Sequence, residues 1–304
     1  MQTIPPLETE LSVTPPPEPP VASELPPHRP YLDRRALYPR AFIGLFLRDL
    51  HVLRREKIPF LIRVCMNPLL FLFVFTYIMP HMGGGAAMNP TAAMAGGEMN
   101  FSTVLLPGLM AVAIMFSGIA AVALPLAQEF GITREIDDRV MCPLPVAAVA
   151  LEKICFSALQ SAIAACIVCP LAIFVPATPV YAQVSNWPFL IVVLALASLT
   201  AGALGLTIGT TVKPQQISLI FGTIVMPITF LGCVYYPWSQ LKPLPWLQYG
   251  VLINPIVYMS EGLRAALTPH VQHMDPRIIL LMLAFFCIVL TLTGIRGFLR
   301  RVIS

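Results

Sequence analysis

The sequence has little charge. Only 11% of its 304 residues are Asp, Glu, Lys or Arg, whereas 57% are hydrophobic, and its mean hydropathy is +0.78. A soluble globular domain carries about 25% charged residues, so this composition excludes an ordinary soluble protein. The long apolar runs indicate a chain that crosses a membrane several times.

Motifs that carry chemistry are also missing. There is no Gly-x-x-x-x-Gly-Lys-Ser/Thr loop to hold the phosphates of ATP and no His-Glu-x-x-His pair to hold zinc. The histidines all lie outside the apolar runs, so a membrane-embedded serine hydrolase would lack a buried base; they are His28, His51, His81, His270 and His273. We therefore expect no enzyme activity, no metal site and no cofactor in this chain.

Two sulfur-rich features suggest metal chemistry only weakly. Cys166 and Cys169 form a Cys-x-x-Cys, but no second pair completes a four-ligand site, and an apolar run surrounds them. We interpret them as buried free thiols that pack as small apolar groups. Residues 79–99 contain five methionines and His81, which are suited to Cu(I). Their irregular spacing favours a flexible loop, and copper binding stays an alternative.

Six apolar runs predict an all-α membrane protein. Each is roughly twenty residues long, enough to cross about 30 Å of hydrocarbon as a helix. The only charges that we find inside them lie near an end, at Arg63, Arg277 and Arg296. A carrier driven by protons or sodium usually needs ionisable groups at mid-membrane, so the pattern disfavours that class. The predicted spans are 58–80, 104–127, 154–176, 187–209, 217–236 and 277–298.

The basic residues indicate the orientation of these spans. Sixteen of the nineteen Lys and Arg residues fall in segments that six spans place on the same side as the two termini. Cytoplasmic segments of membrane proteins are enriched in Lys and Arg. We predict a multi-pass protein of the cell membrane with both termini in the cytoplasm.

The residues before the first apolar run divide into two predicted regions. Ten of the 31 prolines lie in the first thirty residues, which is typical of disorder, and we assign residues 1–33 to a disordered cytoplasmic tail. Residues 34–57 predict an amphipathic connecting helix that lies in the membrane interface and contacts lipids. A plain juxtamembrane linker is the alternative. Residues 58–301 would form the transmembrane domain.

The segment 128–153 is the first candidate for function. It contains five acidic and three basic residues, and Pro143 and Pro145 would end a short helix over 132–140. Such a helix between two spans is well placed to receive force from a soluble partner. A solvated connection is the alternative.

The second candidate is the run YYPWSQLKPLPWLQYGVLINPIVYMSEGLRAAL after the fifth span. It is too apolar for an exposed loop and too rich in proline to cross the membrane, which favours a re-entrant external helical hairpin over a loop lying on the surface. Glu261 and Arg264 are i, i+3 neighbours on the predicted helix, and Asn254 with Pro255 suits its start. We interpret the charged pair as a structural clasp rather than a contact with cargo.

This part of the chain resembles the type-2 (ABC-2) permeases of ATP-binding-cassette exporters. The resemblance is carried by residues 221–264, with Met226–Pro227, YYPWSQLKPLPWLQ and NPIVYMSEGLR. The family pattern Asn-Pro-x-x-Tyr-x-x-Glu-x-x-Arg is matched by Asn254, Pro255, Tyr258, Glu261 and Arg264. The resemblance extends over about residues 40–301: residues 40–57 resemble the family's connecting helix, and 129–153, with Arg139 and Lys153, resemble the loop that bears its coupling helix. The Pro-rich tail departs from the family pattern.

The resemblance implies a permease subunit that works as a homodimer with a cytoplasmic ABC ATPase and moves an apolar or amphiphilic substrate outward. It also implies that the acidic and basic residues before and within 132–140 contact the ATPase: Glu129, Arg134, Glu135, Asp137, Asp138 and Arg139. A membrane scaffold without cargo and a secondary carrier or channel remain alternatives. No nucleic-acid partner is expected.

Overall fold

The computed structural model describes residues 34–74, 78, 101–130, 144–175, 180, 182–212, 216, 219 and 221–303. Within these ranges every regular element is a helix and no strand occurs, so the predicted all-α class is confirmed for this part of the chain. The predicted disordered tail 1–33, the methionine-rich loop 79–99 and the short helix predicted over 132–140 lie outside the described residues.

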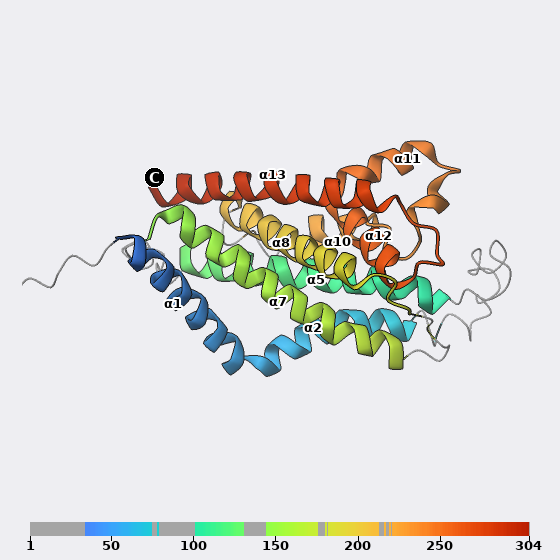
Figure 1. Cartoon of the computed structure of the whole chain (residues 1–304), viewed down its shortest axis with the longest axis horizontal. Helices are drawn as coiled ribbons and strands as arrows, with labels where there is room; N and C mark the ends of the chain where they lie inside the picture. Colours follow the sequence, from blue (N-terminus) through green and yellow to red (C-terminus); the bar gives the residue numbers. More distant parts are fainter. Residues whose placement is uncertain are drawn as a thin grey trace, which may run out of the picture.

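Four long helices form the body of the protein. They are α5 (Phe101–Gln128), α7 (Val146–Phe174), α8 (Trp187–Thr211) and α13 (Pro276–Ile303), and they run side by side (Figure 1). The shortest has 25 residues, or roughly 38 Å at 1.5 Å per residue, which exceeds a hydrocarbon core of about 30 Å. All four are apolar enough to cross a membrane, as expected of a multi-pass membrane protein.

The α5 helix lies at the centre of this bundle and α13 at its edge. In the most apolar stretch of each helix, 78% of α5 but only 17% of α13 is buried inside the protein. Large apolar side chains therefore cover the outer side of α13, where they suit contact with lipid; they include Ile278, Leu281, Phe285, Ile288 and Leu292.

Small residues allow α5 and α8 to pack backbone to backbone. Ala201, Gly205 and Gly209 recur every four residues and so share one face of α8. A Cβ atom at Gly205 would lie 2.9 Å from the Cα of Ile119, and one at Gly118 would lie 2.5 Å from the Cβ of Ala201. Such close approach is typical of helix interfaces in membranes, where dispersion contacts replace the hydrophobic effect.

The predicted count of six spans is not confirmed. The first predicted span, 58–80, overlaps α2 (Lys57–Phe73), and several residues of the rest of that span lie outside the described part of the chain. The fifth coincides with η4 (Phe221–Val225) and α10 (Met226–Phe230), which together cover ten residues. The third predicted span, 154–176, falls largely within α7, which begins eight residues earlier, at Val146, after the extended backbone of Pro145.

The α1 helix (Arg34–Arg55) joins α2 at Glu56, and both lie on the side of the bundle opposite α13 (Figure 1). Part of the apolar face predicted for lipid contact instead packs on the bundle, since the ring of Phe46 lies 6.0 Å from that of Phe156 in an edge-to-face arrangement. Ile43 and Leu47 remain exposed, so membrane contact by α1 stays a prediction.

Short helices close one end of the bundle. The chain from α10 continues through η5 (Trp238–Leu241), α11 (Pro245–Gly250) and η6 (Val251–Ile253) into α12 (Pro255–Leu267). The α12 helix contacts α5, α8 and α13, and it lies at the end of the bundle opposite the C-terminus (Figure 1).

Candidate functional site

The start of α12 is fixed by Asn254. Its Oδ1 accepts a hydrogen bond from the backbone N–H of Ile256 at 3.0 Å, while its Nδ2 donates to the carbonyl of Ile228 at 2.6 Å. One side chain thus caps α12 and joins it to α10. The hydroxyl of Tyr258 donates to the carbonyl of Leu252 at 3.0 Å and secures the preceding turn. The motif residues all belong to α12 or its cap: Asn254, Pro255, Tyr258, Glu261 and Arg264.

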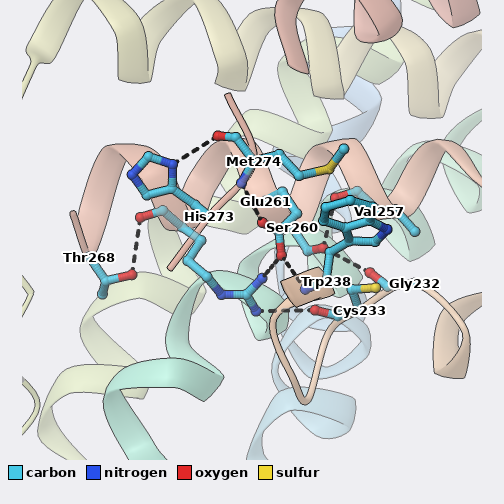
Figure 2. Close-up of polar contacts among 10 residues, drawn as sticks. Gly232, Cys233, Trp238, Val257, Ser260, Glu261, Thr268, His273 and Met274 are labelled. Carbon is cyan, nitrogen blue, oxygen red and sulfur yellow. Dashed lines mark hydrogen bonds and ion pairs between the residues drawn. The ribbon is translucent and has the colours of Figure 1, made fainter. Parts of the chain in front are cut away.

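Glu261 and Arg264 form a completely buried ion pair, since both are 0% exposed. The Nη1 of Arg264 donates to Oε1 of Glu261 at 2.5 Å. The carboxylate also accepts the backbone N–H of Trp238 at 2.9 Å and that of Met274 at 3.0 Å, and Nη2 of Arg264 donates to the carbonyl of Cys233 at 3.1 Å. Figure 2 shows these segments converging on α12. The predicted pairing is confirmed.

This cluster joins three parts of the chain that are distant in sequence. Its partners lie in the turn after α10, at the start of η5 and just before α13. Desolvating two charges is costly, and removing one partner of such a buried pair typically costs about 3–5 kcal/mol. The geometry therefore favours the clasp that the sequence predicted. Sequence reasoning missed the backbone partners, because any residue type can supply an N–H or a carbonyl.

The turn 232–234 is held tightly between α5 and α12. Cys233 has a φ of 53°, in the left-handed region that non-glycine residues seldom adopt. The carbonyl of Gly232 accepts a hydrogen bond from the hydroxyl of Ser260 at 2.8 Å (Figure 2). A Cβ at Gly108 would lie 1.9 Å from the carbonyl oxygen of Val234, so only glycine permits this contact with α5.

The tryptophans of this region differ in environment. The indole N–H of Trp238 donates to the carbonyl of Gln248 at 3.0 Å, which ties η5 to α11. Trp246 and Tyr249 are 73% and 69% exposed. Exposed aromatic rings on an apolar protein suit a membrane interface.

A second buried ion pair lies at the other end of the bundle. The Nζ of Lys153 donates to Oε1 of Glu129 at 2.9 Å, with side chains only 5% and 7% exposed. This contact joins the residue that follows α5 to α7, and so it ties together the two ends of the predicted coupling segment 128–153. The remaining residues predicted to contact the ATPase lie outside the described residues: Arg134, Glu135, Asp137, Asp138 and Arg139.

Arg301 adds a clamp at the same end that sequence reasoning missed. Its Nη1 donates to the carbonyls of Gly209 and Val212 at 2.9 Å each, and its guanidinium carbon lies 4.5 Å from the ring centroid of Phe130. The C-terminal part of α13 thereby caps α8 and holds the residues that follow α5. The excess of basic residues at the C-terminus was the only sequence signal for this clamp, and it did not identify the partners of Arg301.

The six cysteines that the structure describes are free thiols, and Cys142 lies outside the described residues. Their predicted burial is wrong for Cys166, which is exposed, and only partial for Cys169. The side of α7 that carries Cys166 faces away from the bundle. The described residues contain no group of three or more His, Cys, Asp or Glu that could hold a metal ion.

Two cavities open beside α5. One of about 540 Å³ has charged walls from α1, α5 and α7, and one of about 220 Å³ has apolar walls from α2 and α5. They share Arg63, Ala120 and Leu124 as lining residues.

A bundle of membrane-length helices closed at one end by a buried polar clasp defines a multi-pass membrane protein. The family model for the ABC-2 type transporter matches residues 40–268, and the chain belongs to this family. It is therefore the membrane subunit of a transporter. The inner membrane transport permease YadH of Escherichia coli K12 is 25% identical over 231 residues, which cover 75% of this chain and 83% of the relative. The YadH permease of Shigella flexneri matches with the same identity and coverage.

Proposed function

We propose that this chain is the permease of an ABC exporter, and that two copies pair with cytoplasmic ATPases to move an apolar or amphiphilic substrate outward. The observation that carries the proposal is the family match over 40–268, which includes both the clasp and the predicted coupling segment. The chain contains no Gly-x-x-x-x-Gly-Lys-Ser/Thr loop, so a partner must bind the ATP. The relative YadH is itself named a transport permease.

The proposed topology has six crossings, with α2 and the helices over 221–230 supplying the two short ones. Both termini face the cytoplasm, and α11 with α12 forms a re-entrant hairpin on the outer side. Two features support this orientation. The basic C-terminal end of α13 and the start of α7 lie at the end of the bundle opposite α12 (Figure 1), and exposed Trp246 marks the α12 end.

The proposed contact with the ATPase is the segment 128–153. The structure at the two ends of this segment supports the role, because the Lys153–Glu129 ion pair and the Arg301 clamp hold the adjoining helices to one another. Force applied to the segment would then move α5, α7, α8 and α13 together instead of bending one helix end.

Transport into inside-out vesicles tests this function. The permease is reconstituted with and without its ATPase, and uptake of a panel of fluorescent amphiphiles is followed after ATP addition. We expect accumulation only when both subunits and hydrolysable ATP are present. Uptake that does not depend on ATP would indicate a carrier or channel. If no probe is taken up although the ATPase binds normally, the result would favour a scaffold.

A further inference from the structure

We infer that the two cavities beside α5 form one binding site for a phospholipid, with the phosphate at Arg63 and an acyl chain between α2 and α5. The inference deepens the proposed function by naming a ligand class, and it rests on that function. It is carried by the lining that the two cavities share and by two polar side chains that line them, exposed Arg63 and buried Ser117.

The smaller cavity suits an acyl chain. Its volume is about 220 Å³, and apolar side chains of α2, α5 and η4 form its walls: Val64, Pro68, Val112, Ala113, Phe116 and Phe221. Val64 and Val112 are 6% and 1% exposed, so this lining belongs to the protein interior. An acyl chain in this cavity would exchange its contacts with water or bulk lipid for contacts with a close-packed protein wall.

A charge stands where the smaller cavity meets the larger one. Arg63 lines both, and no hydrogen bond or ion pair joins its side chain to any residue that the structure describes. An arginine on a helix that lies in an apolar run needs an anionic or strongly polar partner. Its planar guanidinium can donate two parallel hydrogen bonds to a phosphate.

A second polar group points to the same ligand. Ser117 lines the smaller cavity and is only 5% exposed, yet its hydroxyl has no hydrogen-bond partner within the described ranges. A buried hydroxyl without a partner is unfavourable. The ester carbonyl of a phospholipid, which follows the phosphate by a few atoms, would accept this hydrogen bond.

The larger cavity can hold the rest of the head group. Besides Arg63, its charged lining comprises Arg48, Asp49, Glu56, Glu129 and Lys153. Glu129 is paired with Lys153, and Arg48 and Asp49 place both signs of charge on the α1 side of the cavity. A mixed polar wall of this kind, next to an apolar slot, matches the division of a phospholipid into head group and chain better than it matches a wholly apolar molecule.

Photolabelling of the purified full-length permease, without ATPase, tests the site. One probe is a phosphatidylglycerol with a diazirine in its acyl chain, and the other is the diacylglycerol with the same chain but no phosphate. We expect the phospholipid to label peptides from 60–73 and 109–124 and the diacylglycerol to label them weakly. Arg63→Gln should reduce phospholipid labelling about tenfold, because a charge-assisted contact is lost, and Ser117→Ala should reduce it less.

The matched control is Arg55→Gln, which removes an exposed arginine that lines neither cavity and should leave labelling unchanged. Ala120→Leu should block labelling by filling the junction. Equal labelling by the two probes, or labelling that Arg63→Gln leaves intact in a variant with an unchanged unfolding temperature, would overturn the inference. Labelling needs no ATP, so its failure speaks only against this site, whereas loss of ATP-driven uptake with labelling intact speaks against the proposed function.

Discussion

At the scale of single residues, the protein uses its few charges inside the bundle to hold backbone in place. Glu261 accepts two backbone N–H groups as well as the guanidinium of Arg264, and Arg264 reaches a backbone carbonyl. Ion pairs on a protein surface contribute little to stability. These two residues are fully buried, so each charge depends on the other to compensate for its lost hydration.

Neutralising Glu261 should therefore destabilise the fold strongly. Glu261→Gln leaves the buried Arg264 without a counter-charge, and we expect a loss of about 3–5 kcal/mol, measured as chemical unfolding of the purified protein in detergent. Lys242→Gln is the control, because Lys242 is an exposed charge of the same region. If the two variants unfold alike, the clasp does not stabilise the protein.

Asn254 should show two separable contributions. Asn254→Ala removes both the cap of α12 and the hydrogen bond to Ile228, and it should lower the unfolding free energy by about 1–2 kcal/mol or more. Asn254→Ser keeps an oxygen that can cap the helix, so its loss should be smaller. The order is read from unfolding midpoints of the two variants, and equal losses would mean that the cap contributes nothing.

At the scale of helices, packing rather than propensity positions the elements. The α5 and α8 helices approach so closely that single methyl groups matter at Gly118 and Gly205. The structure also places polar ties at both ends of the bundle: the clasp at α12, and at the other end the Lys153–Glu129 pair and the Arg301 clamp.

A methyl group at the α5–α8 interface should be costly. In Gly205→Ala the new Cβ would lie 2.9 Å from the Cα of Ile119, and overpacking of this kind typically costs about 1–3 kcal/mol. Gly44→Ala is the control, since nothing lies within 4 Å of a Cβ there and alanine favours helix. Thermal unfolding in detergent should show a lower midpoint for Gly205→Ala only; similar midpoints would contradict the close packing.

The Arg301 clamp should matter for coupling more than for folding. Arg301→Gln loses the guanidinium that caps α8 and stacks on Phe130, so the helices beside the predicted coupling segment should move less rigidly. We expect reduced ATP-driven uptake with the permease still inserted in the membrane. Exposed Arg300, changed to Gln, is the matched control, and equal uptake by the two variants would rule out this role for the clamp.

Much of the helical frame could be predicted from the sequence, because its signals are local. The start of α8 at Trp187 follows from two local signals. The Oδ1 of Asn186 accepts the N–H of Phe189, and Pro188 occupies the first turn of the helix. The α7 helix begins eight residues before the predicted third span, and this extension contains the buried Lys153. Its partner Glu129 is 24 residues away, and no local pattern reveals such a pair. The i, i+3 pairing of Glu261 with Arg264 was readable from spacing, but its backbone partners were not.

At the scale of the whole molecule, the protein is a membrane subunit of the ABC-2 type transporter family that contains no phosphate loop of its own. Its two ends differ in character. Buried polar contacts close the α12 end, whereas the opposite end carries the basic terminus, the Lys153–Glu129 pair and the flanks of the predicted coupling segment. This polarity agrees with a permease whose energy arrives from one side of the membrane.

Co-purification tests the central claim, that a separate ATPase drives this permease, most directly. The full-length chain is isolated from its native membrane in mild detergent and the bound proteins are identified. We predict that an ATP-binding subunit is recovered in equal amount, and that Glu135→Lys with Asp138→Lys abolishes its recovery while membrane insertion stays intact. Absence of any ATP-binding subunit from the native complex would contradict the account.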